Sequence, residues 1–461
     1  MTLIKSISGM RGTIGGQVGD AFTPSDIVSL TAAYATWLKK NSIHHKVVIG
    51  RDARISGLMV KNLVIGTLMG CGIDVIDLDL STTPTVEMSV VEHQAGGGII
   101  LTASHNPKQW NALKLLNDKG EFISAEAGAE LLSIAASGLV DYVEVDDLGK
   151  LSTDESAITK HIQHIINMSE VDVEAIKAKN FSVVIDCVNS TGGIALPELL
   201  YALGVQIIHE LFTTPDGNFP HNPEPLPEHL TALSAEVVKH TADLGIAVDP
   251  DVDRLALVCN DGSFFGEEYT LVAVADYLLG IHGGDTVSNL SSSRALKDVT
   301  EKHGYNHHYA AVGEVNVVNK MREVNAVIGG EGNGGIIYPT LHAGRDALLG
   351  IALVLTQLAK SNLTSAELRA SYPNYFISKN KIELNDGIDL NDLLDKVQIK
   401  YAEYQVNTVD GVRIDFDKEW VHLRKSNTEP IIRIYSESAN ETTANQLANK
   451  MIEDIYSIIN N

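Results

Sequence analysis

Residues 246–254 read Ile-Ala-Val-Asp-Pro-Asp-Val-Asp-Arg, a short apolar run followed by three carboxylates at every second position. Apolar residues resume at 255–258, so the pattern predicts a buried strand that ends in a polar loop at the edge of a sheet. Asp249, Asp251 and Asp253 would repel one another and raise one another's pKa unless a cation lay among them. Carboxylate oxygens suit Mg²⁺. The stretch therefore predicts a sheet that carries a divalent cation site at one edge.

Two other interpretations of this loop are less consistent with the residues. An EF-hand calcium loop is excluded because its sixth position would be Arg254 rather than Gly, and its twelfth would be Asn260 rather than Glu. A solvated acidic turn is the second alternative. The apolar segments on both sides of the loop argue against it, because they fix the loop at a sheet edge.

Strands that run into polar loops recur along the chain and alternate with amphipathic helices. Residues 47–49 and 99–101 are further examples, and the second delivers the chain to Thr-Ala-Ser-His-Asn-Pro at 102–107. Thr23 and Pro24 mark the start of a helix, as an N-cap residue and a first-turn proline. This alternation favours parallel α/β layers, in which ligands gather at the carboxyl ends of strands.

The pattern divides the chain into three consecutive mixed α/β domains and a smaller C-terminal α+β domain. In the last block three strands follow in quick succession, at 411–416, 420–423 and 431–435, which predicts an antiparallel sheet. Other expected features are an irregular acidic stretch near 141–154, a strand at 326–328, a helix at 345–359 and a closing helix at 442–459. The predicted domains are 1–154, 155–260, 261–370 and 371–461.

Bulk composition excludes several classes of protein. The chain has 461 residues and a net charge of −24, which argues against a nucleic-acid partner because phosphate backbones require clustered Lys and Arg. Its three cysteines form no disulfide framework or metal knuckle. We see no signal peptide and no membrane span. The sequence therefore predicts a cytoplasmic protein with no membrane or nucleic-acid partner.

Ser104 and Lys114 are candidate catalytic residues in the first block. Ser104 lies in the loop at 102–107, directly after a buried strand, and could act as a nucleophile, although a plain polar turn is the commoner meaning of such a segment. The G-x-S-x-G elbow of hydrolases is absent, which disfavours acyl chemistry. Leu-Lys-Leu at 113–115 places Lys114 near the same loop as a possible proton donor or acceptor.

Two further loops are candidates for substrate binding. Residues 424–430, Arg-Lys-Ser-Asn-Thr-Glu-Pro, together with Arg433, form a local basic patch that could cradle a phosphate. A capped surface turn is an equally good interpretation of that segment taken alone. The glycine-rich loop at 329–335 offers the side chains of Glu331 and Asn333 and lacks dinucleotide and Walker A fingerprints, so a polyhydroxylated ligand or a surface turn fits it.

Taken together and in this order, the four loops resemble those of the α-D-phosphohexomutase superfamily over nearly the whole chain. The matches are T-A-S-H-N-P at 102–107, D-x-D-x-D-R at 249–254, G-E at 330–331 and R-x-S-N-T-E-P at 424–430, with Gly-Met-Arg-Gly at 9–12 in support. The resemblance implies four domains around a central cleft, each supplying one loop. It also implies a phosphorylated Ser104 that donates its phosphate to a hexose monophosphate and recovers the other phosphate of a bisphosphorylated intermediate.

The resemblance assigns roles to individual residues. One Mg²⁺ per chain would be bound by Ser104, Asp249, Asp251 and Asp253, and a hexose bisphosphate would act as activator. Catalytic roles fall to Ser104, Lys114, Arg11, Arg254 and His105. Substrate-binding roles fall to Glu331, Asn333, Arg424, Ser426, Asn427, Thr428 and Arg433.

The sugar loop departs from the common family pattern. Many members read G-E-x-S-G-H, whereas Asn333 here replaces the serine and Gly335 the histidine. This form resembles a subset of phosphoglucosamine mutases, so we expect glucosamine 6-phosphate and glucosamine 1-phosphate as substrates, with mannose or glucose phosphates as the alternative. A phosphatase and a non-catalytic sugar-phosphate-binding protein are the competing classes. We expect a monomer or a homodimer.

Overall fold

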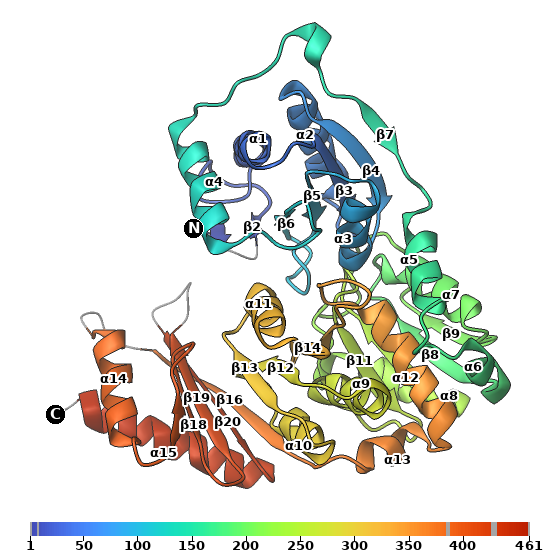
Figure 1. Ribbon diagram of the computed structural model, residues 1–461, viewed down its shortest axis with the longest axis vertical. Helices are drawn as coiled ribbons and strands as arrows, with labels where there is room; N and C mark the ends of the chain where they lie inside the picture. Colours follow the sequence, from blue (N-terminus) through green and yellow to red (C-terminus); the bar gives the residue numbers. More distant parts are fainter. Residues whose placement is uncertain (1, 7–8, 384–387, 426–430, 460–461) are drawn as a thin grey trace. The chain divides into compact units, whose positions relative to one another are not determined.

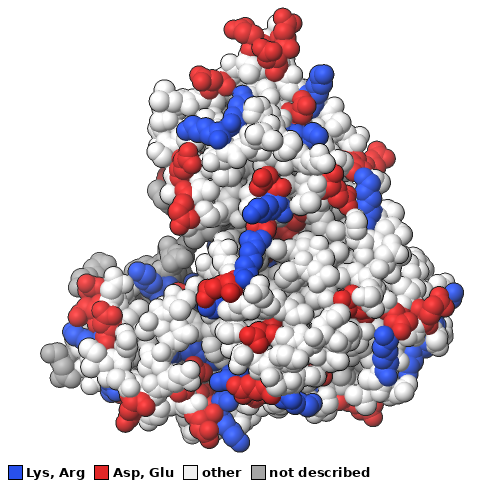
Figure 2. All heavy atoms as spheres, in the orientation of Figure 1, with Lys and Arg blue, Asp and Glu red and all other residues white. Residues whose placement is uncertain are grey.

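The structure is a computed structural model that describes residues 2–6, 9–383, 388–425 and 431–459 (Figure 1). The chain divides into two compact units, described separately below. Unit 1 comprises residues 1–277 and 333–369, and unit 2 comprises residues 278–332 and 370–461. Within the described part of the chain, no helix has the length and apolar character needed to cross a membrane. On the face shown in Figure 2, Lys and Arg side chains are interspersed with Asp and Glu.

Unit 1 begins with a seven-stranded sheet in the order β1-β2-β6-β5-β3-β4-β7. Strands β5, β3, β4 and β7 are parallel, whereas β1, β2 and β6 pair in antiparallel fashion. Helices α1, α2 and α4 contribute to one apolar core against the sheet. The elements are β1 (Ile4–Ser6), β2 (Gly9–Thr13), α1 (Pro24–Asn41), β3 (Lys46–Arg51), α2 (Gly57–Gly70), β4 (Asp74–Leu80), α3 (Thr83–Glu92), β5 (Gly97–Leu101), β6 (Trp110–Leu116), α4 (Ala125–Ser137) and β7 (Leu151–Thr153).

Helix α1 begins where the sequence predicts it. The Thr23 side chain accepts a hydrogen bond from the Asp26 N–H, and the Asp26 carboxylate accepts one from the Thr23 N–H, so the two residues form a capping box ahead of Pro24. The acidic stretch near 141–154 is less irregular than expected, because β7 pairs with β4 there. All three β7 residues are exposed, so this edge strand carries no apolar signal in the sequence.

A second, four-stranded sheet in unit 1 has the order β11-β10-β8-β9. β10 is buried along its whole length and delivers the chain to Asp249, as the opening stretch of sequence predicts. Helix α12 begins at Ala347 rather than at 345, because the Asp346 side chain caps it. The elements are α5 (Ala157–Ile166), α6 (Val173–Lys179), β8 (Ser182–Asp186), α7 (Gly192–Ala202), β9 (Ile207–Leu211), α8 (Thr231–His240), β10 (Leu244–Val248), β11 (Leu255–Cys259), α9 (Glu267–His282), β15 (Gly335–Ile337), α12 (Ala347–Ser361) and α13 (Ser365–Ala370).

Unit 2 contains two groups of strands. In the first, β12 lies between β13 and β14 and is parallel to both, and in the second an antiparallel sheet runs β16-β20-β19-β18-β17. The strand expected at 326–328 lies instead at 328–331, so it includes the first residues of the glycine-rich segment. The elements are β12 (Thr286–Asn289), α10 (Ala295–Lys302), β13 (His307–Ala310), α11 (Glu314–Val324), β14 (Ile328–Glu331), β16 (Phe376–Glu383), α14 (Leu390–Lys400), β17 (Gln405–Asn407), β18 (Val412–Asp415), β19 (Trp420–Lys425), β20 (Ile431–Ser438) and α15 (Glu441–Ile459).

The predicted fold class is confirmed. Mixed α/β sheets form the first three parts of the chain, and an antiparallel sheet with flanking helices forms the smaller C-terminal part. The boundaries of the four domains remain predictions.

Candidate functional site

Three buried carboxylates meet in the turn between β10 and β11. Asp249, Asp251 and Asp253 are completely buried, and each offers a carboxylate oxygen within 4.8 Å of the others. β10 and β11 pair in antiparallel fashion on either side of this turn, and Val252 takes a φ of 62° within it. A β-branched residue rarely adopts this left-handed conformation, so the surrounding structure holds the turn in a strained form.

Asp251 and Asp253 each have one carboxylate oxygen that accepts hydrogen bonds and one that accepts none from the described residues. Asp251 Oδ2 accepts from Lys114 Nζ at 2.6 Å and from Thr83 Oγ1 at 2.5 Å. Asp253 Oδ2 accepts from Lys114 Nζ at 3.2 Å and from Arg345 Nη2 at 2.8 Å. The Oδ1 atoms of Asp251 and Asp253 are buried and have no hydrogen-bond partner among the described residues. Buried carboxylate oxygens without partners are costly, so this donor set fits a divalent cation.

Burial and neighbouring charges shift the pKa values of the groups in and beside the turn in different directions. Burial, together with the charges of Asp251 and Asp253, raises the pKa of Asp249 well above its ordinary value. For Asp251, burial acts in the opposite sense to Lys114, whose charge and hydrogen bond prevail and lower the pKa of the carboxyl. Burial also works against the charge of Lys114, but the two carboxylates outweigh it and raise its pKa. Lys114 therefore carries a proton in the resting site.

Ser104 lies against this carboxylate group. It follows β5, adopts a φ of 46°, and donates a hydrogen bond from Oγ to Asp249 Oδ2 at 2.6 Å. His105 Nδ1 lies 3.5 Å from the same Oγ. Burial, and the positive charge of Arg254, lower the pKa of His105 to about 2, so its ring is neutral. The structure thus brings together three predicted segments: the serine loop with Ser104 and His105, the strand with Lys114, and the turn with the three aspartates.

Two predicted arginines lie at the edges of the same site. Arg11, on β2, donates from Nη1 to Asn106 Oδ1 at 3.5 Å, within the loop that carries Ser104. The Arg254 N–H donates to Asp249 Oδ1 at 3.2 Å, and its guanidinium lies 3.5 Å from Glu224. Both arginines therefore lie near the serine loop or the carboxylate turn.

Three residues that support the site were not predicted from the sequence. Thr83 and Arg345 bind the carboxylates of Asp251 and Asp253, and Arg54 holds the serine loop. The Arg54 guanidinium is fully buried, pairs with Asp52 at 2.9 Å, and donates to backbone carbonyls of Ser104, Asn106, Pro107 and Trp110. Arg54 follows Gly-Arg-Asp at 50–52, where β3 ends, and this polar segment was the signal in the sequence for a functional loop. An arginine near a strand end is usually exposed, so the segment did not indicate a buried clamp.

We expect Arg54→Ala to destabilise the protein by about 3–5 kcal/mol, because it leaves a buried carboxylate and four carbonyls without their donor. Chemical denaturation measures this as a fall in the free energy of unfolding. The control is Lys40→Ala, in the same unit. Lys40 is more than half exposed and pairs with Glu130 at 3.7 Å, so its removal should cost less than about 1 kcal/mol. Equal losses for the two variants would show that Arg54 does not hold the loop.

The predicted substrate-binding residues divide between the two units. In unit 2, Glu331 Oε1 accepts from Asn289 Nδ2 at 2.9 Å and from the Gly313 N–H at 3.0 Å. Arg424 on β19 and Arg433 on β20 are register partners. Asn333 belongs to unit 1, where its Oδ1 accepts from the Gly335 N–H at 3.2 Å. The remaining three, Ser426, Asn427 and Thr428, lie outside the described residues.

Models of four protein-family domains match the chain in order. Those described as phosphoglucomutase/phosphomannomutase alpha/beta/alpha domains I, II and III match residues 3–139, 159–262 and 266–375, and the C-terminal domain matches residues 381–454.

Individual proteins are similar to the chain over almost its full length. A phosphoglucomutase/phosphomannomutase from Thermococcus kodakarensis is 36% identical over 96% of this chain and 98% of its own. A probable phosphoglucosamine mutase from Methanopyrus kandleri is 32% identical over 96% of each chain. The crystal structure of a phosphoglucomutase/phosphomannomutase family protein from Burkholderia thailandensis shares the fold, with a TM-score of 0.86 at 24% identity over 99% of this chain and 98% of that one.

Proposed function

The chain belongs to the phosphoglucomutase/phosphomannomutase family, whose members are isomerases that move phosphoryl groups, and from this premise we propose that it interconverts glucosamine 6-phosphate and glucosamine 1-phosphate through a phosphorylated Ser104. The observation that carries the proposal is the hydrogen bond of 2.6 Å between Ser104 Oγ and Asp249. It sets a hydroxyl, on a loop clamped by Arg54, against three carboxylates suited to a cation.

The proposed reaction has two phosphoryl transfers. In the first, a sugar hydroxyl forms a bond to the phosphorus on Ser104, the serine O–P bond breaks, and a bisphosphorylated sugar results. In the second, Ser104 Oγ takes the other phosphate from the intermediate, which leaves the isomeric monophosphate. Each transfer moves one proton from the attacking hydroxyl and returns one to the leaving oxygen. Lys114, which is protonated in the resting site, is proposed to give its proton to the leaving oxygen and to recover one from the attacking hydroxyl.

The carboxylate group has a separate role. Asp249, Asp251 and Asp253, with a phosphoryl oxygen on Ser104, would hold Mg²⁺, which offsets the charge that develops on a transferring phosphoryl group. Arg11 and Arg254 would bind the same phosphoryl oxygens, because planar guanidinium groups match their geometry. His105 is neutral and lies beside Oγ, so it would accept a hydrogen bond without adding charge.

The proposed sugar specificity rests on Glu331 and on the departure at Asn333. Glu331 is a carboxylate that could bind a 2-ammonium group, whereas a mannose or glucose phosphate offers only a hydroxyl there. Arg424 and Arg433, with Ser426, Asn427 and Thr428, would grip the phosphate that is not reacting. A hexose bisphosphate would restore phosphate to Ser104 after loss of an intermediate.

We expect kcat/KM for glucosamine 1-phosphate to exceed that for mannose 1-phosphate and glucose 1-phosphate by at least ~10-fold, or about 1.4 kcal/mol in transition-state binding. Coupled mutase assays on the three sugars, run side by side, measure this ratio. One relative is named a phosphoglucomutase/phosphomannomutase and another a probable phosphoglucosamine mutase. The assay therefore distinguishes between two substrate classes that both occur among the relatives' names. A ratio inverted by the same factor would assign the enzyme to mannose or glucose phosphate.

A further inference from the structure

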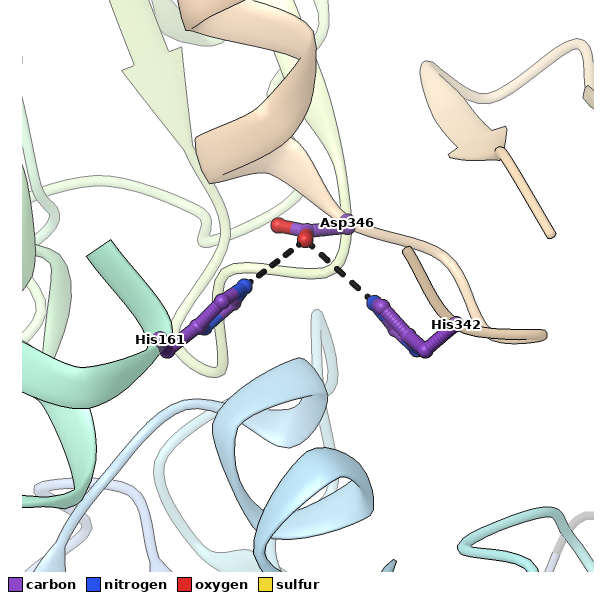
Figure 3. A group of neighbouring side chains, drawn as sticks. All are labelled: His161, His342 and Asp346. Atoms are coloured by element: carbon purple, nitrogen blue, oxygen red, sulfur yellow. Dashed lines mark hydrogen bonds and ion pairs between the residues drawn. The ribbon is translucent and has the colours of Figure 1, made fainter. Parts of the chain in front are cut away.

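A second group of metal-ligating side chains lies in unit 1 and has no part in the proposed reaction. His161 projects from α5, Asp346 is the N-cap of α12, and His342 comes from the loop before that helix (Figure 3). Asp346 Oδ2 lies 2.9 Å from His161 Nε2 and 3.3 Å from His342 Nε2. One nitrogen of each ring and one oxygen of Asp346 all lie within 4.8 Å of one another. A tetrahedral ion with bonds of about 2.0–2.1 Å holds its ligands about 3.3 Å apart, so this spacing accommodates a metal ion as well as direct hydrogen bonds.

The other nitrogen of each imidazole ring already has an oxygen partner on α3. His161 Nδ1 lies 2.9 Å from Thr85 Oγ1, and His342 Nδ1 lies 3.3 Å from Glu87 Oε2. Metal-ligating histidines nearly always use the second ring nitrogen as a donor to an oxygen, which fixes the tautomer and aims the first nitrogen at the ion. Both rings therefore direct Nε2 toward the shared point. Nδ1 of His161 is held by a hydrogen bond, whereas Nδ1 of His342 lies at ion-pair distance from Glu87.

Two buried carboxylates flank the two rings. Asp346 Oδ1 accepts the N–H groups of Leu348 and Leu349, which leaves Oδ2 for the two histidines. Glu87 is almost completely buried, and its Oε2 lies at ion-pair distance from His342 Nδ1. Asp346 Oδ2 is therefore left to face the two rings that would share an ion with it.

We propose that His161 Nε2, His342 Nε2 and Asp346 Oδ2 form a site for Zn²⁺ or a similar transition-metal ion. Two imidazoles and one carboxylate suit Zn²⁺, whereas the carboxylate turn of Asp249 suits Mg²⁺, so the two sites select different ions. His342 and Glu87 also line a cavity of about 590 Å³, from which water supplies the fourth ligand.

The proposed ion would fix the position of elements that support the carboxylate turn. α3, α5 and α12 come from three parts of unit 1, and α5 packs against both α3 and α12. Arg345, beside Asp346, binds Asp253, and Thr83, two residues before Thr85, binds Asp251. Zn²⁺ bound here would act as a structural ion. It would influence activity through the contact of Arg345 with Asp253 and that of Thr83 with Asp251.

The test is a metal titration of the full chain after chelator treatment, in a large excess of Mg²⁺ that supplies the carboxylate turn. We expect one equivalent of Zn²⁺ to bind, and Co²⁺ to replace it with the strong visible absorption of tetrahedral coordination. His342→Gln should weaken binding by at least ~100-fold, and Glu87→Gln, which leaves all three ligands in place, by ~10–100-fold.

The matched control is His164→Gln. His164 lies on α5, three residues after His161, and lines the same cavity, but its side chain is half exposed and pairs with Glu92. Its replacement should leave both the stoichiometry and the affinity unchanged. Absence of Zn²⁺ and Co²⁺ binding in the wild type, or equal affinity in wild type and Glu87→Gln, would overturn the proposal and leave a protonated His342 as the link between the two carboxylates. Glu87→Gln keeps the test valid if His342→Gln does not fold.

Discussion

Ser104→Ala is expected to reduce mutase turnover by at least ~10⁴-fold, because the variant has no oxygen at the position that carries the transferred phosphate. The side chain keeps its Cβ, and the loop keeps the backbone contacts of Arg54, so folding should be retained. Intact mass should show added phosphate on some or all wild-type molecules and none on the variant. Circular dichroism and melting temperature check that the loss is chemical.

The control for this variant is Ser25→Ala, an exposed serine on the first turn of α1. It removes the same atom at a place far in sequence from the serine loop, and turnover should stay at the wild-type level. Normal turnover by Ser104→Ala would remove the serine from the mechanism. Partial phosphorylation of the wild type is compatible with it, since loss of a bisphosphate intermediate leaves the serine free.

The second large effect concerns the carboxylate turn. Asp251→Asn should cut turnover by at least ~10²-fold, because the loss of one charge weakens the cation that offsets phosphoryl charge and also weakens the ion pair to Lys114. The metal-free protein should also lose stability, because the attraction of Lys114 outweighs the repulsion within the trio at Asp251, and the variant leaves Lys114 with Asp253 as its charged partner. Steady-state kinetics across a Mg²⁺ titration, with denaturant unfolding of the metal-free form, measure both effects.

Asp146→Asn serves as the control, since Asp146 is an exposed acid that lies outside the turn. Chelator treatment of the wild type should reproduce the loss seen in Asp251→Asn, and added Mg²⁺ should restore activity to the wild type far better than to the variant. Full activity of chelator-treated wild type without added metal would refute a role for the ion.

The parts of the site that depend on a local pattern of residues could be predicted from the sequence. β10 is continuously apolar and buried, so the position of Asp249 at its end could be predicted from residues 246–254. The start of α1 was likewise visible as Thr23 followed by Pro24, whereas the capping-box partner Asp26 was not predicted. The contact between Ser104 and Asp249 joins residues 145 positions apart, and only the family resemblance indicated it.

Other features have no local signal. Arg54 and Arg345 are charged residues that the fold buries, and nothing in their immediate neighbours distinguishes them from surface arginines. His161 and Asp346 are 185 positions apart, so their contact depends on how α5 and α12 pack. Strand β14 extends into a glycine-rich segment because Gly329 and Gly330 both pair with β12. A propensity argument would assign these glycines to a loop.

Transfer of phosphate between Ser104 and the sugar can be followed in a single-turnover experiment. Enzyme that carries labelled phosphate on Ser104 is mixed with unlabelled glucosamine 1-phosphate, and the label is followed in the protein, the sugar phosphates and inorganic phosphate. We expect label to leave Ser104 at the rate of turnover and to appear first in a bisphosphorylated sugar and then in the monophosphates. Label that stays on the protein through many turnovers, or that is released only as inorganic phosphate, would rule out Ser104 as the phosphate carrier.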